Sequence, residues 1–364
     1  MTNPNEPFAE ELIDHKYMEG ELELELGALR GKTILLVGGS GFLGTAFKKF
    51  LLYLNNNNEL FIKRPCYIIS VDNYIKGTTA LSDETVDDNL ICLQHDITRP
   101  IEEKLGYLGR NVDYIINCSG NASPKQYERY PYETIEVSIA GVKNLLNLAK
   151  DTKATILNFS SSEVLGTPPD NEIPTTEESV SRLHAMNRRA PYDVSKLMIE
   201  TLSYLAFERG VNCKVVRPFN IIGYFNKDDF RVIPNYFNKL KLGRPIQVFL
   251  PGTQTRTFCF YSDFIVGCIK VLSRSGGYRS KEGILYHLGN SDNEIQMIDL
   301  AKRVASLYDR PDLVAYADTP EVYLTEPKRR CPSIEKARKD LGYNPKITLN
   351  DMLIKIKVWV DLTY

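Results

Sequence analysis

The sequence predicts an α/β protein with a doubly wound parallel sheet and a smaller lobe formed by the C-terminal part of the chain. Short apolar runs alternate with helical segments from residue 31 to about residue 223, and a glycine-rich turn follows the first run. After residue 223 the alternation stops. Short β-rich runs separated by helices are typical of parallel strands joined by crossover helices. The 364 residues, 43% of them hydrophobic, can bury a core of that size.

The first part of the chain supplies the expected sheet. The predicted strands are KTILLVGG, CYIISVD, LICLQHD, VDYIINCSG, ATILNFSSSE and CKVVRPFNIIG. Between them, TAFKKFLLYL, TIEVSIAGVKNLLNLAK and YDVSKLMIETLSYLAFERG have helical spacing. We predict a nucleotide-binding domain over residues 31–223 and a mainly substrate-binding lobe over 224–364, with some of the later chain returning to the sheet. A ligand cleft is expected between them, at the carboxyl ends of the strands.

Residues 1–30 form an acidic extension before the first strand. It is acidic where a secretory signal peptide would be basic and then apolar. We expect it to be partly helical and docked on the body, with its charge run forming a solvated face. No apolar stretch of the sequence is long enough to cross a bilayer. These features predict a cytoplasmic location.

Composition argues against several classes of function. The formal net charge of −1 gives no basic footprint for nucleic acid or a membrane surface. The seven cysteines are odd in number and form no CxxC pair, which indicates reduced thiols. None of the four histidines is spaced like a metal-ligand pair, so no metal site is predicted.

The stretch ILLVGGSGFLG predicts a dinucleotide site of the Rossmann type. Gly38 permits the tight turn, Gly41 lets the backbone approach a pyrophosphate, and Gly44 lets the helix pack on the strand. Asp72 ends the second predicted strand, where a carboxylate accepts both ribose hydroxyls and repels a 2′-phosphate. NAD is therefore favoured over NADP. The alternative is that Asp72 only caps a loop, and the same two interpretations apply to Asp96, which ends LQHDI.

Tyr192 and Lys196 lie one helical turn apart in APYDVSKLMIE. A phenol of pKa about 10 is a poor base at neutral pH, but a nearby ammonium and a nicotinamide cation both favour the phenolate. Tyr192 can then take a proton from a sugar hydroxyl. The alternative is an exposed helix pair. The hydroxyl-rich strand end with Ser161, Ser162 and Glu163 is expected to face this pair.

These motifs together resemble the extended short-chain dehydrogenase/reductases, and within them the UDP-glucuronate decarboxylases. The resemblance covers roughly residues 31 to 358. It is carried by VGGSGFLG, VDNYIKG, HDIT, NASPKQY, SSSEVLG, YDVSK, RPFNIIG, GRPIQVFLPGTQTRTFCFYSD, HLGN and RRCPSIEKARKDLGYNP. It implies bound NAD, a nucleotide-sugar substrate (most often a UDP-sugar), and a homodimer formed through helices at about 132–150 and 192–209.

The resemblance also implies roles for individual residues. Tyr192 and Lys196 are the expected proton-transfer pair, Ser161 bonds the C4 oxygen, and Ser162 and Glu163 act around C5 and the carboxylate. Expected cofactor contacts, besides Tyr192 and Lys196, come from Gly38, Ser40, Gly41, Phe42, Leu43, Gly44, Asp72, Asn73, Asp96 and Ile97. Expected substrate contacts come from Asn220, Arg231, Arg256 and Arg330. For Arg330 and Arg231 the alternative is a surface arginine.

The three residues at the serine-rich strand end distinguish the activities within this superfamily. Dehydratases resemble one another in a Thr-Asp-Glu sequence, whose aspartic acid protonates the departing hydroxyl, whereas decarboxylases have Thr-Ser-Glu. Ser161, Ser162 and Glu163 are closest to the decarboxylase pattern. Without the aspartic acid, a dehydratase lacks its acid for expelling water.

The sequence departs from the family pattern on the substrate side of the cleft. Leu165 replaces a tyrosine, Ser138 replaces a supporting asparagine, Gly120 begins GNAS instead of SPAS, and IGYFN follows Asn220. Two alternatives therefore stay open beside the decarboxylase: an epimerase or 4,6-dehydratase-like enzyme acting on another nucleotide sugar, and a non-catalytic NAD-binding sensor or scaffold.

Overall fold

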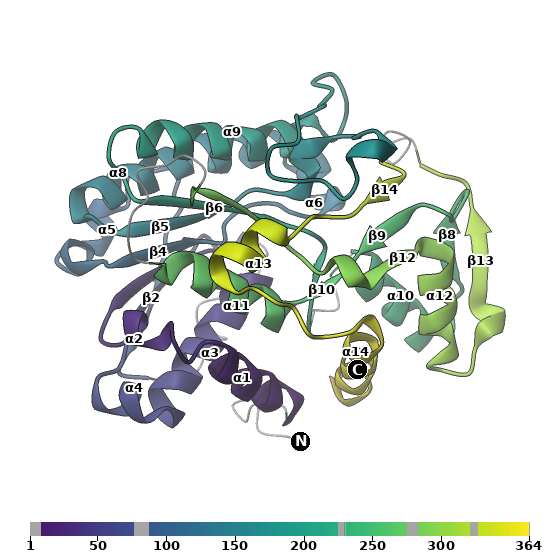
Figure 1. Cartoon of the computed structure of the whole chain (residues 1–364), viewed down its shortest axis with the longest axis horizontal. Coiled ribbons are helices and arrows are strands. Elements are labelled where there is room, and N and C mark those ends of the chain that lie inside the picture. The colour runs from purple at the N-terminus through teal and green to yellow at the C-terminus, as the bar shows by residue number, and fades with distance from the viewer. Residues whose placement is uncertain are drawn as a thin grey trace.

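The computed structural model describes residues 9–75, 87–224, 229, 231–274, 283–320 and 327–363. Its centre is a seven-stranded parallel sheet in the order β11-β6-β5-β4-β1-β2-β3 (Figure 1). The strands are β1 Thr33–Val37, β2 Tyr67–Asp72, β3 Leu90–Gln94, β4 Tyr114–Asn117, β5 Thr155–Phe159, β6 Cys213–Pro218 and β11 Leu285–Leu288. The strand order reverses between β1 and β4, on either side of the glycine-rich turn. The predicted doubly wound parallel sheet is confirmed.

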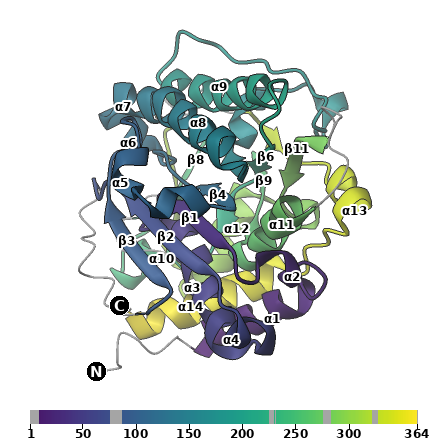
Figure 2. The same ribbon diagram turned by 90° about the vertical axis from the view of Figure 1, so that its left-hand side faces the viewer.

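Helices cover both faces of this sheet because the central strands are apolar on both sides. Helices α8 (Val142–Thr152) and α9 (Ala190–Phe207) lie on one face, and α3 (Phe42–Asn57) and α11 (Tyr261–Ser273) lie on the other (Figures 1 and 2). Shorter helices stand at the periphery: α4 Glu59–Lys63, α5 Glu102–Leu105, α6 Pro124–Arg129 and α7 Pro131–Glu136.

The helix expected over residues 134–150 contains a π-helical turn, Val137–Gly141, between α7 and α8. Gly141 lies against the side chain of Ile97, and an added Cβ would come within 2.8 Å of Ile97 Cδ1. Ser138 is buried in this turn. Single π-turns inside α-helices are frequent at functional sites, and this one lies on the face that also carries α9.

The C-terminal lobe lies beyond the carboxyl ends of the strands (Figure 1). Its helices are α10 Val232–Lys241 and α12 Met297–Ser306, with the parallel pair β8 Ile246–Phe249 and β13 Val314–Ala317. A three-stranded sheet joins β9 Thr255–Thr257 to β12 Glu294–Gln296 and β14 Arg329–Arg330. The short pair β7 Ile221–Ile222 and β10 Cys259–Phe260 and the helix α14 Leu349–Thr363 complete it. Helix α13 Glu335–Leu341 instead packs against β11 and α11 of the main sheet (Figure 1). Strand β11 and helix α11 return to the main sheet.

The acidic extension forms helices α1 (Ala9–Glu21) and α2 (Leu26–Leu29), which pack on the α3/α11 side of the sheet (Figure 2). Met18 and Leu22 are fully buried there. Asp14 is only 1% exposed and accepts hydrogen bonds from Tyr224 (2.8 Å) and Tyr261 (3.1 Å). Its other oxygen lies 3.1 Å from Lys355 Nζ on α14. The expectation of a solvated charged face is therefore wrong for this helix.

Other acidic residues of the extension pair with lysines of the body. Glu10 pairs with Lys355 (2.9 Å), Glu11 with Lys49 (2.8 Å) and Glu25 with Lys270 (3.1 Å). These lysines belong to α14, α3 and α11. The extension thus joins the C-terminal helix to the nucleotide-binding half. Its local sequence could not show this, because the partner lysines are far away along the chain.

Among the residues described, no helix has the length and apolar character required to span a membrane. Nor do the described histidines, cysteines and carboxylates form a group that could hold a metal ion.

Replacing Asp14 with alanine should lower the free energy of unfolding by about 2–4 kcal/mol, because it removes a buried carboxylate that pairs with Lys355 and accepts from two phenol hydroxyls. Equilibrium urea unfolding measures this change. The matched control is Glu335→Ala, whose side chain is 73% exposed in a surface pair with Arg338, and which should change stability by less than about 1 kcal/mol. Equal stability of the two variants would contradict a buttressing role for α1.

Candidate active site

The glycine-rich turn lies between β1 and α3. Gly38 has φ +73°, in the left-handed region that favours glycine, and its amide donates to the Val71 carbonyl at 2.8 Å. An added Cβ at Gly44 would lie 2.1 Å from the Gly38 carbonyl oxygen. Helix α3 begins at Phe42, so the free backbone amides of its first turn lie directly after the glycine-rich turn. The predicted roles of Gly38 and Gly44 match this close packing.

Asp72 lies at the end of β2 beside the glycine-rich turn. Its carboxylate accepts hydrogen bonds from the amides of Ser40 (3.0 Å) and Tyr74 (2.9 Å). The hydroxyl of Ser40 is buried and has no hydrogen-bond partner among the described residues. Asp72 therefore does cap the loop, and its contact with a ribose stays a prediction. Asn73 caps the next turn by accepting from the Ile75 amide at 3.2 Å.

The second adenine-side candidate, Asp96, makes a loop cap. Its carboxylate accepts from both the amide and the hydroxyl of Thr98 at 2.9 Å. Ile97 is 4% exposed and packs into the core. Contact of Asp96 and Ile97 with a cofactor stays a prediction.

Tyr192 and Lys196 face the end of β5 from the first turns of α9, and both are buried. Ser161 donates a hydrogen bond to the Tyr192 phenol oxygen, and accepts one from the Glu163 amide at 3.2 Å. Lys196 Nζ donates to the Phe159 carbonyl at 2.8 Å and lies 5.8 Å from the Tyr192 ring centroid. The alternative of an exposed helix pair is wrong. The structure brings Tyr192, Lys196 and Ser161 together as predicted.

The phenol of Tyr192 is not acidified by the protein alone. Burial raises its pKa to about 12, although the Ser161 hydrogen bond lowers it and the Glu163 charge raises it further. Burial also lowers the pKa of Lys196 to about 8. Within the protein alone, desolvation has the largest effect on the pKa of Tyr192. The expected effect of the nicotinamide cation stays a prediction. Tyr127 stacks on the Tyr192 ring at 5.4 Å and fixes its plane.

Glu163 lies between two arginines. Arg330 forms a bidentate pair, with Nη1 2.7 Å from Oε1 and Nη2 2.7 Å from Oε2. Arg189 adds a contact from Nη2 to the same Oε2 at 2.6 Å. The Arg330 and Arg189 charges hold the pKa of Glu163 below its usual value despite burial. Arg330 is 7% exposed, so its interpretation as a surface arginine is wrong.

Arg256 and Asn220 lie next to this group. Parallel pairing of β14 and β9 puts Arg330 directly beside Arg256, which is 6% exposed and donates to the Pro327 carbonyl at 2.9 Å. Asn220 has φ +45° and donates to the Thr257 carbonyl at 2.8 Å. A non-glycine residue in this region is uncommon and is concentrated at functional sites. Contact of Asn220 and Arg256 with the substrate stays a prediction.

Arg231 lies farther toward the glycine-rich turn. Its guanidinium is 4.7 Å from the Phe42 ring centroid and forms an ion pair with Asp229. It also donates to the Ile221 carbonyl at 3.2 Å. Contact with the substrate phosphates stays a prediction for this residue.

The structure places the remaining candidates as follows. Ser162 and Leu165 are buried in a short 3₁₀ turn, Ser162–Leu165, directly after β5. Gly120 has φ +134° and faces Lys196, whose Nζ would lie 3.5 Å from an added Cβ. Leu165, which replaces a tyrosine of the family pattern, thus contributes to packing beside the site. Gly120 leaves room next to the lysine.

Arg189 was not predicted from the sequence. It precedes Tyr192 by three residues in NRRAPY, and its neighbour Arg188 is exposed. An arginine this close to the tyrosine was the only available indication. Its acidic partner is 26 residues away along the chain, so local spacing could not identify it.

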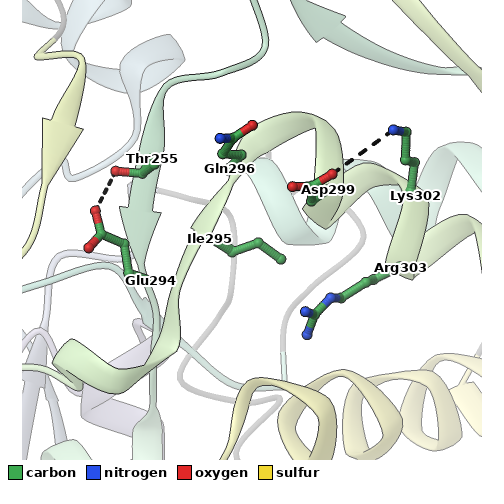
Figure 3. Close-up of a pocket in the computed structure, with 7 residues that line it drawn as sticks. All are labelled: Thr255, Glu294, Ile295, Gln296, Asp299, Lys302 and Arg303. Atoms are coloured by element: carbon green, nitrogen blue, oxygen red, sulfur yellow. Dashed lines mark hydrogen bonds and ion pairs between the residues drawn. The ribbon is translucent and has the colours of Figure 1, made fainter.

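A separate hollow of ≈ 680 Å³ lies on the C-terminal lobe, where β9 and β12 meet α12 (Figure 3). It is lined by Thr255, Glu294, Ile295, Gln296, Asp299, Lys302 and Arg303. The predicted site residues are not among these. Glu294 is held by Thr255 and Arg329, and Asp299 and Lys302 are more than half exposed. This hollow has solvated charges of both signs, whereas Arg189, Arg256 and Arg330 are buried around Glu163.

A family model described as the NAD dependent epimerase/dehydratase family matches residues 34–284. The chain belongs to this family. UDP-glucuronic acid decarboxylase 6 of Arabidopsis thaliana is 32% identical over 325 residues, which cover 88% of this chain and 86% of that protein. UDP-glucuronic acid decarboxylase 1 of Danio rerio is 29% identical, with coverage of 89% and 71%.

Solved structures of similar shape have the same fold. One is DesIV, a dTDP-glucose 4,6-dehydratase from Streptomyces venezuelae, with TM-score 0.76, 22% identity and coverage of 91% and 97%. Another is a UDP-glucuronic acid 4-epimerase from Bacillus cereus, with TM-score 0.73, 20% identity and coverage of 91% and 100%.

The residues at the glycine-rich turn fit the dinucleotide of an NAD-dependent family. Gly38, Gly41 and Gly44 keep the loop free of side chains beside the amides at the start of α3. The buried hydroxyl of Ser40 is available to a ligand, and Asp72 supplies a carboxylate at the end of β2. Asp72 together with the glycine-rich turn would hold the adenosine and pyrophosphate part, and Tyr192 with Lys196 would face the reactive end.

Replacing Gly44 with alanine should weaken NAD binding by at least about tenfold and lower stability by more than about 1 kcal/mol, because the new Cβ meets backbone rather than a movable side chain. Fluorescence titration with NAD and thermal unfolding measure the two effects. Gly20→Ala is the control, since no atom lies within 4 Å of its added Cβ. Native NAD affinity in the Gly44 variant would contradict the packing described for the turn.

Proposed function

We propose that this protein is an NAD-dependent decarboxylase of a nucleotide sugar, with UDP-glucuronate as substrate and UDP-xylose or the corresponding 4-keto pentose as product. The observation that carries the proposal is the arrangement of Glu163. It pairs with Arg330 beside Tyr192, while the neighbouring position, where a dehydratase needs an acid, is Ser162. Relatives at 29–32% identity named UDP-glucuronic acid decarboxylase support it.

The reaction begins at the C4 hydroxyl of the sugar. Tyr192 accepts the hydroxyl proton, and Ser161, hydrogen-bonded to the phenol, holds the C4 oxygen. NAD, which the glycine-rich turn and Asp72 would hold, would supply reversible hydride transfer at C4 and a positive charge. Lys196 adds a second cation next to the ring. These positive charges act against the burial that raises the pKa of Tyr192.

The 4-keto uronate is a β-keto acid, so its carboxylate can leave as carbon dioxide. The C5–carboxylate bond breaks, and its electron pair forms an enolate across C4 and C5 with negative charge on the C4 oxygen. Tyr192 and Ser161 stabilise that oxygen by hydrogen bonds. A proton then adds at C5. The residues need only orient the carboxylate and hold the developing charge.

Glu163 is charged in this scheme. Arg330 and Arg189 keep its pKa low, so the carboxylate acts by charge and hydrogen bonding and is not the proton donor at C5. Arg330 is the group that can bind the substrate carboxylate, because its guanidinium matches a carboxylate with two hydrogen bonds. Arg256 and Asn220 are proposed to bind the diphosphate, and Arg231 to contribute to the same phosphates.

We extend the proposal to the state of the protein in the cell. A homodimer formed by the α7–α8 segment and α9 is supported by the exposed apolar side chains of Tyr132 (79%), Tyr204 (42%) and Leu205 (45%) on those helices. A cytoplasmic location is supported by the seven cysteines, all of which lie in the described part of the chain as free thiols. Sedimentation of the purified protein tests the first point, and fractionation of the source cells tests the second.

Purified protein given UDP-glucuronate and NAD should release one carbon dioxide for each sugar consumed, because the 4-keto intermediate decarboxylates. Capture of labelled carbon dioxide and chromatography of the nucleotide sugars measure this. An epimerised or dehydrated sugar formed without carbon dioxide would overturn the decarboxylase and support the other enzyme activities. NAD binding with no turnover of any nucleotide sugar would support a sensor or scaffold.

The assigned base is tested by Tyr192→Phe, which removes only the phenol oxygen. Turnover should fall by about 10²–10⁴-fold, the typical contribution of a positioned acid or base, while NAD stays bound. A near-normal rate would show that another group takes the proton.

A further inference from the structure

Arg189 stands at a position where a cation is locally unfavourable. It is the residue immediately before α9, and the amides of Tyr192 and Asp193 donate to its carbonyl at 3.0 Å. The N-terminus of a helix carries partial positive charge and favours anions. Arg189 is also only 5% exposed. A buried cation at a helix N-terminus needs nearby carboxylates to compensate its charge, and a local rule broken in this way often marks a functional position.

Two carboxylates compensate it. Arg189 Nη2 contacts Glu163 Oε2 at 2.6 Å, and its Nε lies 3.6 Å from Asp193 Oδ2, one turn into α9. The side chains of Glu163 and Asp193 are 16% and 10% exposed. Asn187 fixes the backbone by accepting from the Arg189 amide at 2.7 Å. The guanidinium is therefore held at both its Nε and Nη2 positions.

The two Nη atoms of Arg330 cannot form a bidentate pair with Glu163 and with a substrate carboxylate at the same time. Both of its Nη atoms are directed at Glu163 in this structure. To bind a substrate carboxylate with both Nη atoms, Arg330 must release Glu163. Arg330 belongs to β14 of the C-terminal lobe, whereas Arg189 directly precedes α9, the helix that carries Tyr192. Glu163 would then be left with Arg189.

We propose that Arg189 is a positioning residue that keeps Glu163 ionised and in place beside Tyr192 while Arg330 binds the carboxylate of the substrate. The proposal rests on the proposed function for the identity of that substrate. The contact between Arg189 and Glu163 itself does not depend on it. Arg189 acts through Glu163 and is not placed to touch the reacting atoms.

The charged groups that face Glu163 set the direction of the pH effect. They are Arg330 from β14, Arg256 from β9, and Arg189, with Tyr192 and Asp193 on α9. The arginines lower the pKa of Glu163, so the carboxylate form is lost only as the pH falls through that lowered value. Removing one arginine raises the pKa. As the pH is lowered, a step that needs ionised Glu163 then begins to slow at a higher pH than it does in the unmodified protein.

The test compares Arg189→Gln, Arg189→Lys and the surface control Arg310→Gln, whose partner Asp312 is exposed. We expect Arg189→Gln to lower kcat by about ten- to hundredfold, the usual range for a lost charge-assisted hydrogen bond, and to shift the acidic limb of the kcat profile to higher pH. KM should change much less, and NAD should stay bound. Arg189→Lys should restore part of kcat and of the pH profile, and Arg310→Gln should match the unmodified protein.

A double-mutant cycle separates positioning from general structural support. In a Glu163→Gln background, Arg189→Gln should cause no further loss of kcat, because its partner charge is already gone. Additive losses, or a kcat profile unchanged by Arg189→Gln, would overturn the proposal.

A measurement on the substrate-free protein distinguishes failure of this proposal from failure of the proposed function. Glutamate labelled with ¹³C at the side-chain carboxyl gives a titration for Glu163, assigned by its loss in Glu163→Gln. Its midpoint should rise in Arg189→Gln and stay unchanged in Arg310→Gln. An unchanged midpoint in Arg189→Gln would refute the role of Arg189, whichever sugar the enzyme uses. Absence of carbon dioxide release by the unmodified protein would refute only the proposed function.

Discussion

Glu163 is placed between Arg330 of the C-terminal lobe and Arg189 at the start of α9, so one carboxylate connects the two parts of the site. Charges this far from water need partners, because an unpaired buried ion costs several kcal/mol. The pairing therefore constrains where β14 can lie relative to the end of β5 and the first turn of α9. In the proposed mechanism it also leaves Glu163 to contribute charge rather than a proton, because the arginines hold its pKa low. The catalytic assignment, the expected position of the substrate carboxylate and the role of Arg189 all follow from this group.

The surrounding fold supplies the rigidity that such a cluster requires. The parallel sheet brings the ends of β1, β2, β4, β5 and β6 to one edge, with the glycine-rich turn and the serine-rich strand end on neighbouring parts of it. Pairing of β14 with β9 sets Arg330 beside Arg256. On the opposite face, Asp14 of the extension binds Tyr224, Tyr261 and Lys355. These contacts join the C-terminal helix α14 to the nucleotide-binding half.

Much of this arrangement could be predicted from the sequence because it is encoded locally. The turn at Gly38 and Gly44, the acidic end of β2 and the spacing of Tyr192 and Lys196 each depend on a few consecutive residues. The contacts that were missed join distant segments: Arg189 meets Glu163, and Asp14 meets Lys355. Local spacing cannot indicate which lysine an acidic residue will pair with, so the charge run of the extension was expected to form a solvated face. The extent to which burial raises the pKa of Tyr192 also could not be predicted, because desolvation depends on how much protein surrounds the ring.

The most direct test of the account is the fate of C5 during turnover in D₂O. If Tyr192 opens the reaction at C4 and the β-keto acid loses its carboxylate, the pentose product should contain one solvent-derived deuterium at C5. NMR and mass spectrometry of the nucleotide-sugar product measure this. A product that retains its carboxylate, or a pentose with no deuterium at C5, would contradict the account.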